Sequence, residues 1–224
     1  MSDAGLYRLL AWLSPGYPVG AFAYSHGVEW AVEEGRVTDA ETLCDWIRDL
    51  LRHGGGWTDA VVFSHAYDAA EACEPLARLN ALALALAPSR ERLLETAAQG
   101  TAFLKTTTDA WPWPGVEQTA ATLKPDVAYP VAVAAAARGH GVPKEAALSA
   151  FLHGFAANLT SAGVRLIPLG QTAGQQIIAR LEPLVGAVSQ QALRAALDDL
   201  GGVAILSDIA SMRHETQYTR LFRS

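Results

Sequence analysis

Apolar residues recur at helical spacing along almost the whole chain, and this periodicity restricts the possible folds more than any other feature of the sequence. Residues 38–54, TDAETLCDWIRDLLRHG, show the pattern with its boundaries: Thr38 and Glu41 fit a capping box, and Gly54 can end the helix. No segment shows the sustained alternation of apolar and polar residues that is typical of a strand. We therefore expect an all-α fold, a single multi-helix domain of roughly ten helices over residues 1–224.

Serines, threonines and prolines predict further helix boundaries. Ser89 can cap one helix, and Pro130 can begin another. Thr172 and Gln175 fit a second capping box, at the start of a helix that Pro183 would close or kink.

The composition suggests a protein that covers part of its surface with a partner. Half of the 224 residues are hydrophobic and only 18% are charged, so the surface should hold more apolar area than a monomer usually exposes. The net charge of −6, without a basic stripe, does not suit binding to nucleic acid. No apolar run approaches the ~20 residues that cross a membrane, and the first residues lack a secretory signal pattern. Two cysteines without CxxC spacing fit the cytoplasm.

The histidines and carboxylates form no recognisable catalytic or metal-binding motif. None of the six histidines lies in an HxxxH pair, and the chain has neither a GxxxxGK[ST] loop nor a GxSxG motif. His26 and Glu29 would share a helix face, where they could form half of a metal site, but a surface pair or a buried hydrogen bond is the simpler interpretation. We therefore expect a protein that works by binding, with no catalytic residue and no metal site of its own.

Two segments carry more specific detail than a plain helical core needs. In SPGYPVGAFAYSHGVEWAVEEG, a tight turn precedes Tyr24, Ser25, His26 and Glu29, which lie among small residues that would let another backbone approach; ordinary helix packing is the alternative.

The second segment is SAGVRLIPLGQTAGQ. Arg165 lies in the last turn of an otherwise apolar helix, and Gln171 and Gln175 follow a Pro-Leu-Gly break. Arg165 can serve the carbonyl groups at the helix end, or it can anchor an interface.

The sequence ends in a basic, aromatic arm, residues 214–224, HETQYTRLFRS, although the protein as a whole is acidic. Its apolar spacing is thin beyond Glu215, so we expect the arm to add little to the core and to dock onto a partner; folding back onto its own domain is the alternative. The arm residues that would bind the partner are His214, Glu215, Tyr218, Arg220, Leu221 and Phe222. The helix before the arm should be seated by Val203, Ile205, Leu206 and Ile209.

The two segments and the arm resemble, in this order, the signature stretches of the UreF family of urease accessory proteins. The resemblance runs from Leu13 to Ser224, with mild departures at Gly16, Tyr17 and Ala23. It implies a cytoplasmic, all-helical dimer without a tightly bound cofactor, which helps to deliver nickel to the urease apoprotein. It also implies two further partners, UreD (also called UreH) and the GTPase UreG, with the C-terminal arm docking onto UreD.

Three other functions stay open at the level of the sequence. The chain could activate GTP hydrolysis by UreG through an arginine supplied in trans, for which Arg165, Arg213, Arg220 and Arg223 are candidates by type. It could carry nickel directly, although the histidine spacing argues against this. It could also be a helical enzyme with an unrecognised site.

Overall fold

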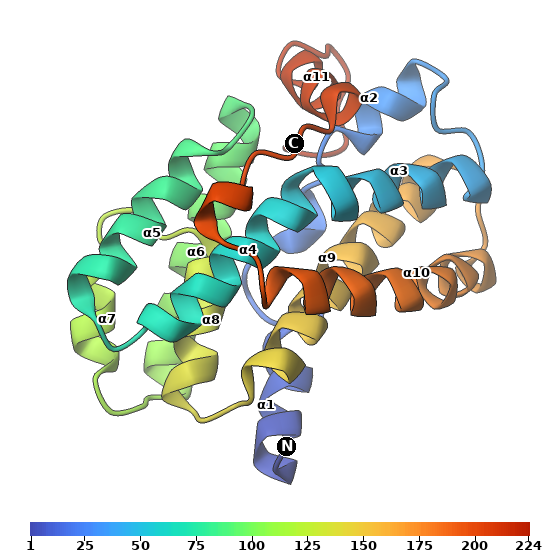
Figure 1. Ribbon diagram of the computed structural model, residues 1–224. Coiled ribbons are helices and arrows are strands. Elements are labelled where there is room, and N and C mark those ends of the chain that lie inside the picture. The colour runs from blue at the N-terminus through green and yellow to red at the C-terminus, as the bar shows by residue number, and fades with distance from the viewer.

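Eleven α-helices and two short 3-10 turns account for the fold, and no β-strand is present (Figure 1). The structure is a computed structural model that describes residues 1–224. The helices are α1 (Asp3–Trp12), α2 (Val28–Glu33), α3 (Ala40–His53), α4 (Gly55–Ala69), α5 (Cys73–Ala85), α6 (Arg90–Ala110), α7 (Val116–Thr122), α8 (Tyr129–Gly139), α9 (Lys144–Leu166), α10 (Gln171–Ala192) and α11 (Ile205–His214). The turns are η1 (Ala21–Ala23) and η2 (Leu197–Asp199). The expected all-α domain of roughly ten helices is confirmed.

Helix α8 lies at the centre of the hydrophobic core. Its sequence, YPVAVAAAARG, is apolar on every side, and all residues from Pro130 to Ala137 are buried. A helix of this composition has no face to offer to water. Its small alanines let α4, α6 and α9 pack against it from different directions, so the core forms around α8.

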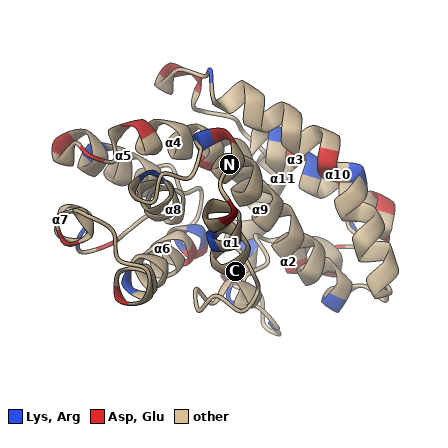
Figure 2. Ribbon diagram, turned by 90° about the horizontal axis from the view of Figure 1, so that it is seen from below, with Lys and Arg blue, Asp and Glu red and all other residues tan.

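The other helices are arranged around this centre. Helix α3 packs against α10, and α5 packs against α7. Helix α1 extends from the lower end of the molecule, whereas α2 and α11 lie together at its upper end (Figure 1). Charged residues of both signs are interspersed along the helices (Figure 2). None of the helices combines the length and the apolar character that a membrane span needs.

Some expected helix boundaries are confirmed and others are displaced. Ser89 caps α6 as expected. The capping box of α3 is formed by Asp39 and Thr42, so the prediction of Thr38 and Glu41 is wrong. The carboxylate of Asp39 accepts a hydrogen bond from the Thr42 backbone N–H at 2.8 Å, and this side chain serves the free N–H group of the first turn.

Helix α10 also differs from the expectation. It begins at Gln171 after Gly170, without a side-chain cap, so the predicted capping box of Thr172 and Gln175 is wrong. Pro183 lies inside the helix, which continues to Ala192. A proline removes one helical hydrogen bond, but contacts with α9 and α3 along α10 outweigh this local cost.

Helix α11 is turned the other way from the prediction, with its apolar side toward solvent. Its buried residues are Ser207, Ala210, Ser211 and His214. The apolar residues of this segment are exposed by 43% to 62%, namely Val203, Ile205, Leu206, Ile209 and Met212. The prediction that Val203, Ile205, Leu206 and Ile209 seat the helix is therefore wrong. Polar contacts hold the helix instead, for example the hydrogen bond between the hydroxyls of Ser211 and Ser89.

Two glycines allow helices of the core to approach their neighbours closely. A Cβ atom at Gly100 of α6 would lie 2.0 Å from the carbonyl oxygen of Val127, just before α8. A Cβ atom at Gly163 of α9 would lie 2.2 Å from Leu43 of α3. The contact at Gly100 is with backbone, which cannot move aside as a side chain can.

Replacement of this glycine tests the packing. Gly100→Ala should lower the free energy of unfolding by about 1–3 kcal/mol, because the clash with Val127 exceeds the gain in helix propensity. Gly186→Ala in α10 is the matched control: a Cβ atom there meets nothing within 4 Å, so it should raise the same quantity by up to about 1 kcal/mol. Urea denaturation measures both. Equal effects of the two substitutions would contradict the proposed close approach.

Candidate functional site

The chain enters α2 through two consecutive residues in the left-handed conformation. His26 has a φ of 53° and Gly27 a φ of 77°, so the helix begins only at Val28. A Cβ atom at Gly27 would lie 2.7 Å from the backbone nitrogen of Ser211, and glycine therefore allows α11 to approach this loop. The prediction that His26 and Glu29 share a helix face is wrong, because His26 lies before the helix.

Glu29, on α2, binds the C-terminal arm through its carboxylate. One oxygen accepts a hydrogen bond from the backbone N–H of Leu221 at 2.6 Å, and the other accepts from that of Phe222 at 2.9 Å. The side chain is almost fully buried. A buried carboxylate is costly unless its oxygens are hydrogen-bonded, so Glu29 and the arm stabilise each other.

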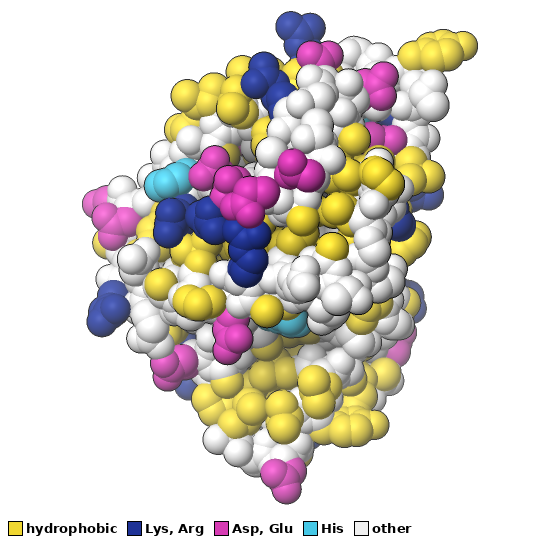
Figure 3. All heavy atoms as spheres, turned by 90° about the vertical axis from the view of Figure 1, so that its right-hand side faces the viewer, with side chains coloured by type: hydrophobic (Ala, Val, Ile, Leu, Met, Phe, Trp, Pro, Cys, Tyr) yellow, Lys and Arg dark blue, Asp and Glu magenta, His cyan; other side chains and the backbone are white.

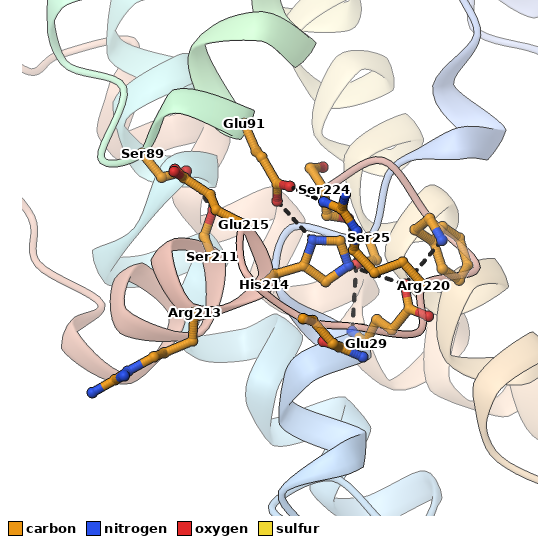
Figure 4. A network of polar contacts seen from close by, with 12 residues as sticks. Ser25, Glu29, Ser89, Glu91, Ser211, Arg213, His214, Glu215, Arg220 and Ser224 are labelled. Carbon is orange, nitrogen blue, oxygen red and sulfur yellow. Dashed lines mark hydrogen bonds and ion pairs between the residues drawn. The ribbon is translucent and has the colours of Figure 1, made fainter.

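His214, at the start of the arm, lies between two carboxylates (Figure 4). Its Nε2 atom is 3.0 Å from Glu29, and its Nδ1 atom is 2.7 Å from Glu91 on α6. The second oxygen of Glu91 accepts a hydrogen bond from the guanidinium group of Arg220 at 2.9 Å. Three segments far apart in the sequence thus meet at one buried histidine, whose exposure is 0%.

A second buried carboxylate, Glu95, lies one helix turn after Glu91. It accepts hydrogen bonds from His26 Nε2 at 2.7 Å and from the Ser224 hydroxyl at 2.9 Å, and it contacts Arg92. Burial acts to raise the pKa of Glu95, but the charges of Arg92 and His26 and these hydrogen bonds outweigh it and lower the pKa to about 2. Burial, followed by the charge of Arg92, lowers the pKa of His26.

The end of the arm is tied to the loop before α2. Ser25 donates from its backbone N–H to the carbonyl oxygen of Ser224 at 2.6 Å, and its hydroxyl donates to the same oxygen. Arg223 donates from its backbone N–H to the carbonyl of Ala23 at 2.7 Å. Tyr24, between them, is buried.

Arg165, in the last turn of α9, contacts the arm through Phe222. Its guanidinium group lies 3.6 Å from the ring centre of Phe22 and 4.2 Å from that of Phe222. Both distances fit cation–π contacts. Arg165 also donates to the carbonyl of Ser161 in its own last turn, as expected from its position near the helix end. Its stacking between two aromatic rings was not expected.

The expectation that residues beyond Glu215 add little to the core is therefore wrong. Phe222 is 4% exposed and Ser224 is fully buried. We use the term arm seat for Ser25, Glu29, Glu91, Glu95 and Arg165 together with the contacts that they make with residues 214–224. The spacing of apolar residues in the arm did not predict this burial, because backbone N–H groups and polar side chains make most of the contacts.

The side chains of the other residues expected to bind partners lie outside the arm seat. Gln171 and Gln175 are exposed at the start of α10. Tyr218 and Leu221 point into solvent from the seated arm, and they are 103% and 65% exposed. Glu215 accepts a hydrogen bond from the backbone N–H of Arg90 at 2.9 Å. Partner binding by these residues stays a prediction.

Glu91 and Glu95 are functional residues that the sequence reading missed. They lie four residues apart, and therefore on one face of α6, in the segment RERLLETAAQG. This spacing is a detectable signal. It does not reveal the partners, because His26, His214 and Arg220 come from distant parts of the chain.

A cavity of about 320 Å³ lies beside the arm seat, and His26, Arg92 and Glu95 form part of its wall. Asp59 of α4 also lines this cavity and is partly exposed. Burial raises the pKa of Asp59 to about 7, against a smaller lowering effect of Arg92. No three of the chain's His, Cys, Asp and Glu side chains are grouped as ligands for one metal ion.

The contact between Glu29 and the arm can be tested by substitution. Glu29→Ala should release the arm, because two backbone N–H groups and His214 lose their acceptor; the free energy of unfolding should fall by about 2–4 kcal/mol. Hydrogen exchange should show lost protection of the Leu221 and Phe222 amides, while circular dichroism shows the helices retained. Glu33→Ala, at an exposed position of the same helix, is the control. Unchanged protection in Glu29→Ala would contradict the arm seat.

Asp59 should make stability depend on pH. A carboxyl group whose pKa is raised in the folded state favours folding below its unfolded pKa, and this contribution is lost as pH rises to about 7. Asp59→Asn should therefore match the original protein near pH 4 and exceed its unfolding free energy by about 1–3 kcal/mol at pH 8. Urea denaturation across this range measures the difference. Exposed Asp49→Asn is the control, and a pH-independent difference for Asp59→Asn would exclude this explanation.

Comparisons with known proteins point to one family. The sequence model of the UreF family matches residues 37–182. A urease accessory protein UreF of Rhodopseudomonas palustris (strain HaA2) is 52% identical over 99% of this chain and 94% of its own length. The urease accessory protein UreF of Azorhizobium caulinodans is 52% identical over 96% of this chain and 94% of its own length. That of Bradyrhizobium diazoefficiens is 51% identical over 99% and 92%.

The family model ends before the arm, but two of these alignments extend over 99% of the chain. The likeness predicted from the two signature segments and the arm is thus confirmed by alignments of nearly full length. The chain belongs to the UreF family of urease accessory proteins.

Proposed function

We propose that this protein is a non-enzymatic scaffold of urease maturation in the cytoplasm. It binds UreD (UreH), recruits and regulates the GTPase UreG, and thereby assists the delivery of nickel to the urease apoprotein. It holds no cofactor tightly, and nickel is handled by the complex that it joins. Family membership supports the role in maturation. The surface described next supports binding as the mode of action.

The observation that carries this proposal is the outward apolar face of α11. Five large apolar side chains of residues 203–212 are exposed there, while Ser207, Ala210, Ser211 and His214 of the same helix are buried. Exposed apolar patches on a folded domain mark sites of association. The patch adjoins the arm, from which Tyr218 and Leu221 also face solvent. UreD is the partner that we assign to this surface.

A second apolar surface supports a homodimer. Leu6, Tyr7 and Leu10 of α1 are exposed by 46%, 66% and 66%, and Leu10 lies three residues after Tyr7 and four after Leu6, so it shares a side of the helix with both. Figure 3 shows hydrophobic side chains gathered at the lower end of the molecule, which α1 forms in Figure 1. A second copy fits this surface, because two identical apolar helix faces can pack about a two-fold axis.

The alternative function is activation of UreG through an arginine, and the arm seat reduces the number of candidate arginines. Arg165 is stacked between two rings, and Arg220 is bound to Glu91. Arg213 points away from the polar network in Figure 4 and is exposed. Arg223 is exposed too, and its side chain makes no ion pair or hydrogen bond. If an arginine acts in trans, Arg213 and Arg223 are therefore the candidates that the fold leaves available. GTP turnover by UreG with the original protein, with Arg213→Ala and with Arg223→Ala tests this alternative.

Substitutions on the two apolar surfaces should have separate effects. Ile209→Asp should abolish co-purification with UreD and urease activation in a reconstituted system, because it places a charge in the centre of the α11 patch, but the isolated protein should stay a dimer. Leu10→Asp should give a monomer by light scattering and leave binding to UreD in place. Circular dichroism checks the fold of both variants. Full UreD binding by Ile209→Asp would refute the assignment of α11.

A further inference from the structure

We propose that seating of the C-terminal arm takes up one proton, which is held between His214 and its two carboxylate partners. The observation behind this inference is a count of hydrogen atoms at the buried histidine. His214 Nδ1 is 2.7 Å from Glu91 Oε2, and His214 Nε2 is 3.0 Å from Glu29 Oε2. Each of these contacts needs one hydrogen. A neutral imidazole carries only one hydrogen on its two nitrogens, and an ionised carboxylate carries none.

Neither carboxylate is free to turn away from the ring. Glu29 accepts hydrogen bonds from the backbone N–H groups of Leu221 and Phe222, which can only donate. The second oxygen of Glu91 is held by the guanidinium of Arg220, which can also only donate. Without a second hydrogen, one ring nitrogen would face a carboxylate oxygen with two lone pairs opposed. The seated arm therefore holds one proton more than a neutral histidine and two carboxylates bring.

The charges around the ring favour this extra proton. The charged groups that contact His214 or its partners are Glu29 from α2, Glu91 from α6 and Arg220 from the arm itself. With the proton present, two negative and two positive charges balance in this cluster. His214 is also the last residue of α11, where the helix dipole favours a cation. Loss of the proton would leave one negative charge uncompensated in a buried place.

The sign of the pH effect follows from the released arm. An imidazole in water loses its second proton at about pH 6.5. Above that pH the released arm lacks the proton and the seated arm holds it, so the equilibrium constant for seating should fall about tenfold per pH unit. Below about pH 6 both states hold the proton, and the equilibrium should become flat. The extension of this effect to partner docking rests on the proposed function, whereas the proton uptake itself does not.

The first test detects the proton directly. In the full chain labelled with ¹⁵N-histidine, both ring nitrogens of His214 should show the chemical shifts of protonated nitrogens at pH 8. Exposed His53 supplies the comparison signal. Spectra of His214→Gln and His53→Gln assign the signals. A neutral pattern for His214, in a sample whose Leu221 and Phe222 amides remain protected from exchange, would overturn the proposal.

The second test removes the need for the proton. In Glu91→Gln the side-chain amide can donate to Nδ1 of a neutral His214, while its carbonyl oxygen still accepts from Arg220. The protection factors of the Leu221 and Phe222 amides should fall about tenfold per pH unit from pH 7 to 9 in the original protein and stay constant in Glu91→Gln. Glu215→Gln, which removes the neighbouring charge but no contact to the ring, should keep the original slope.

A flat profile in the original protein, or an unchanged slope in Glu91→Gln, would contradict the proposal. Neither measurement uses a partner protein. Failure of UreD to bind the α11 surface would leave both results as they are, so the proton-linked arm and the proposed scaffold function can fail separately.

Discussion

The upper end of the molecule, where α2, α11 and the arm meet, depends on the hydrogen bonds of the Glu29 carboxylate. This carboxylate accepts from two backbone N–H groups of the arm and contacts His214, all inside the protein. A buried carboxylate is unfavourable alone and favourable when all of its neighbours are present. The left-handed turn at His26 and Gly27 aims α2 so that Glu29 reaches the arm, and the same turn lets α11 approach. Loop, helix and arm therefore form as one cooperative unit.

The core supplies the rigid frame for this unit. Helix α6 carries Glu91 and Glu95 on the face that meets the arm, and its position is fixed by the close contact of Gly100 with the chain before α8. The alanine-rich α8 can be surrounded on all sides because its side chains are small. Precise placement of buried charges needs such a frame, since their hydrogen bonds weaken steeply with distance and angle.

Much of the fold could be predicted from the sequence, but only part of the site could. Helical periodicity and signals such as Ser89 are local, and they placed most helices correctly. Pro183 does not close α10, which was one of its two predicted effects, because tertiary contacts along the helix outweigh a local preference. The face of α11 was assigned wrongly because apolar spacing reveals which side is apolar, not whether it faces the core. The arm seat escaped prediction because Glu29 and His214 are 185 residues apart, and no local pattern records such a contact.

The separation of these partners has a consequence for biosynthesis. Glu29, Glu91 and Glu95 leave the ribosome long before residues 214–224, which supply His214 and Arg220. Until then the nascent chain holds several carboxylates around an unfilled space, and they repel one another. The helical core can form during translation from contacts that are closer in sequence. The upper end of the molecule can be completed only after translation has reached the arm, so an interrupted chain would carry an intact core and an open, acidic end.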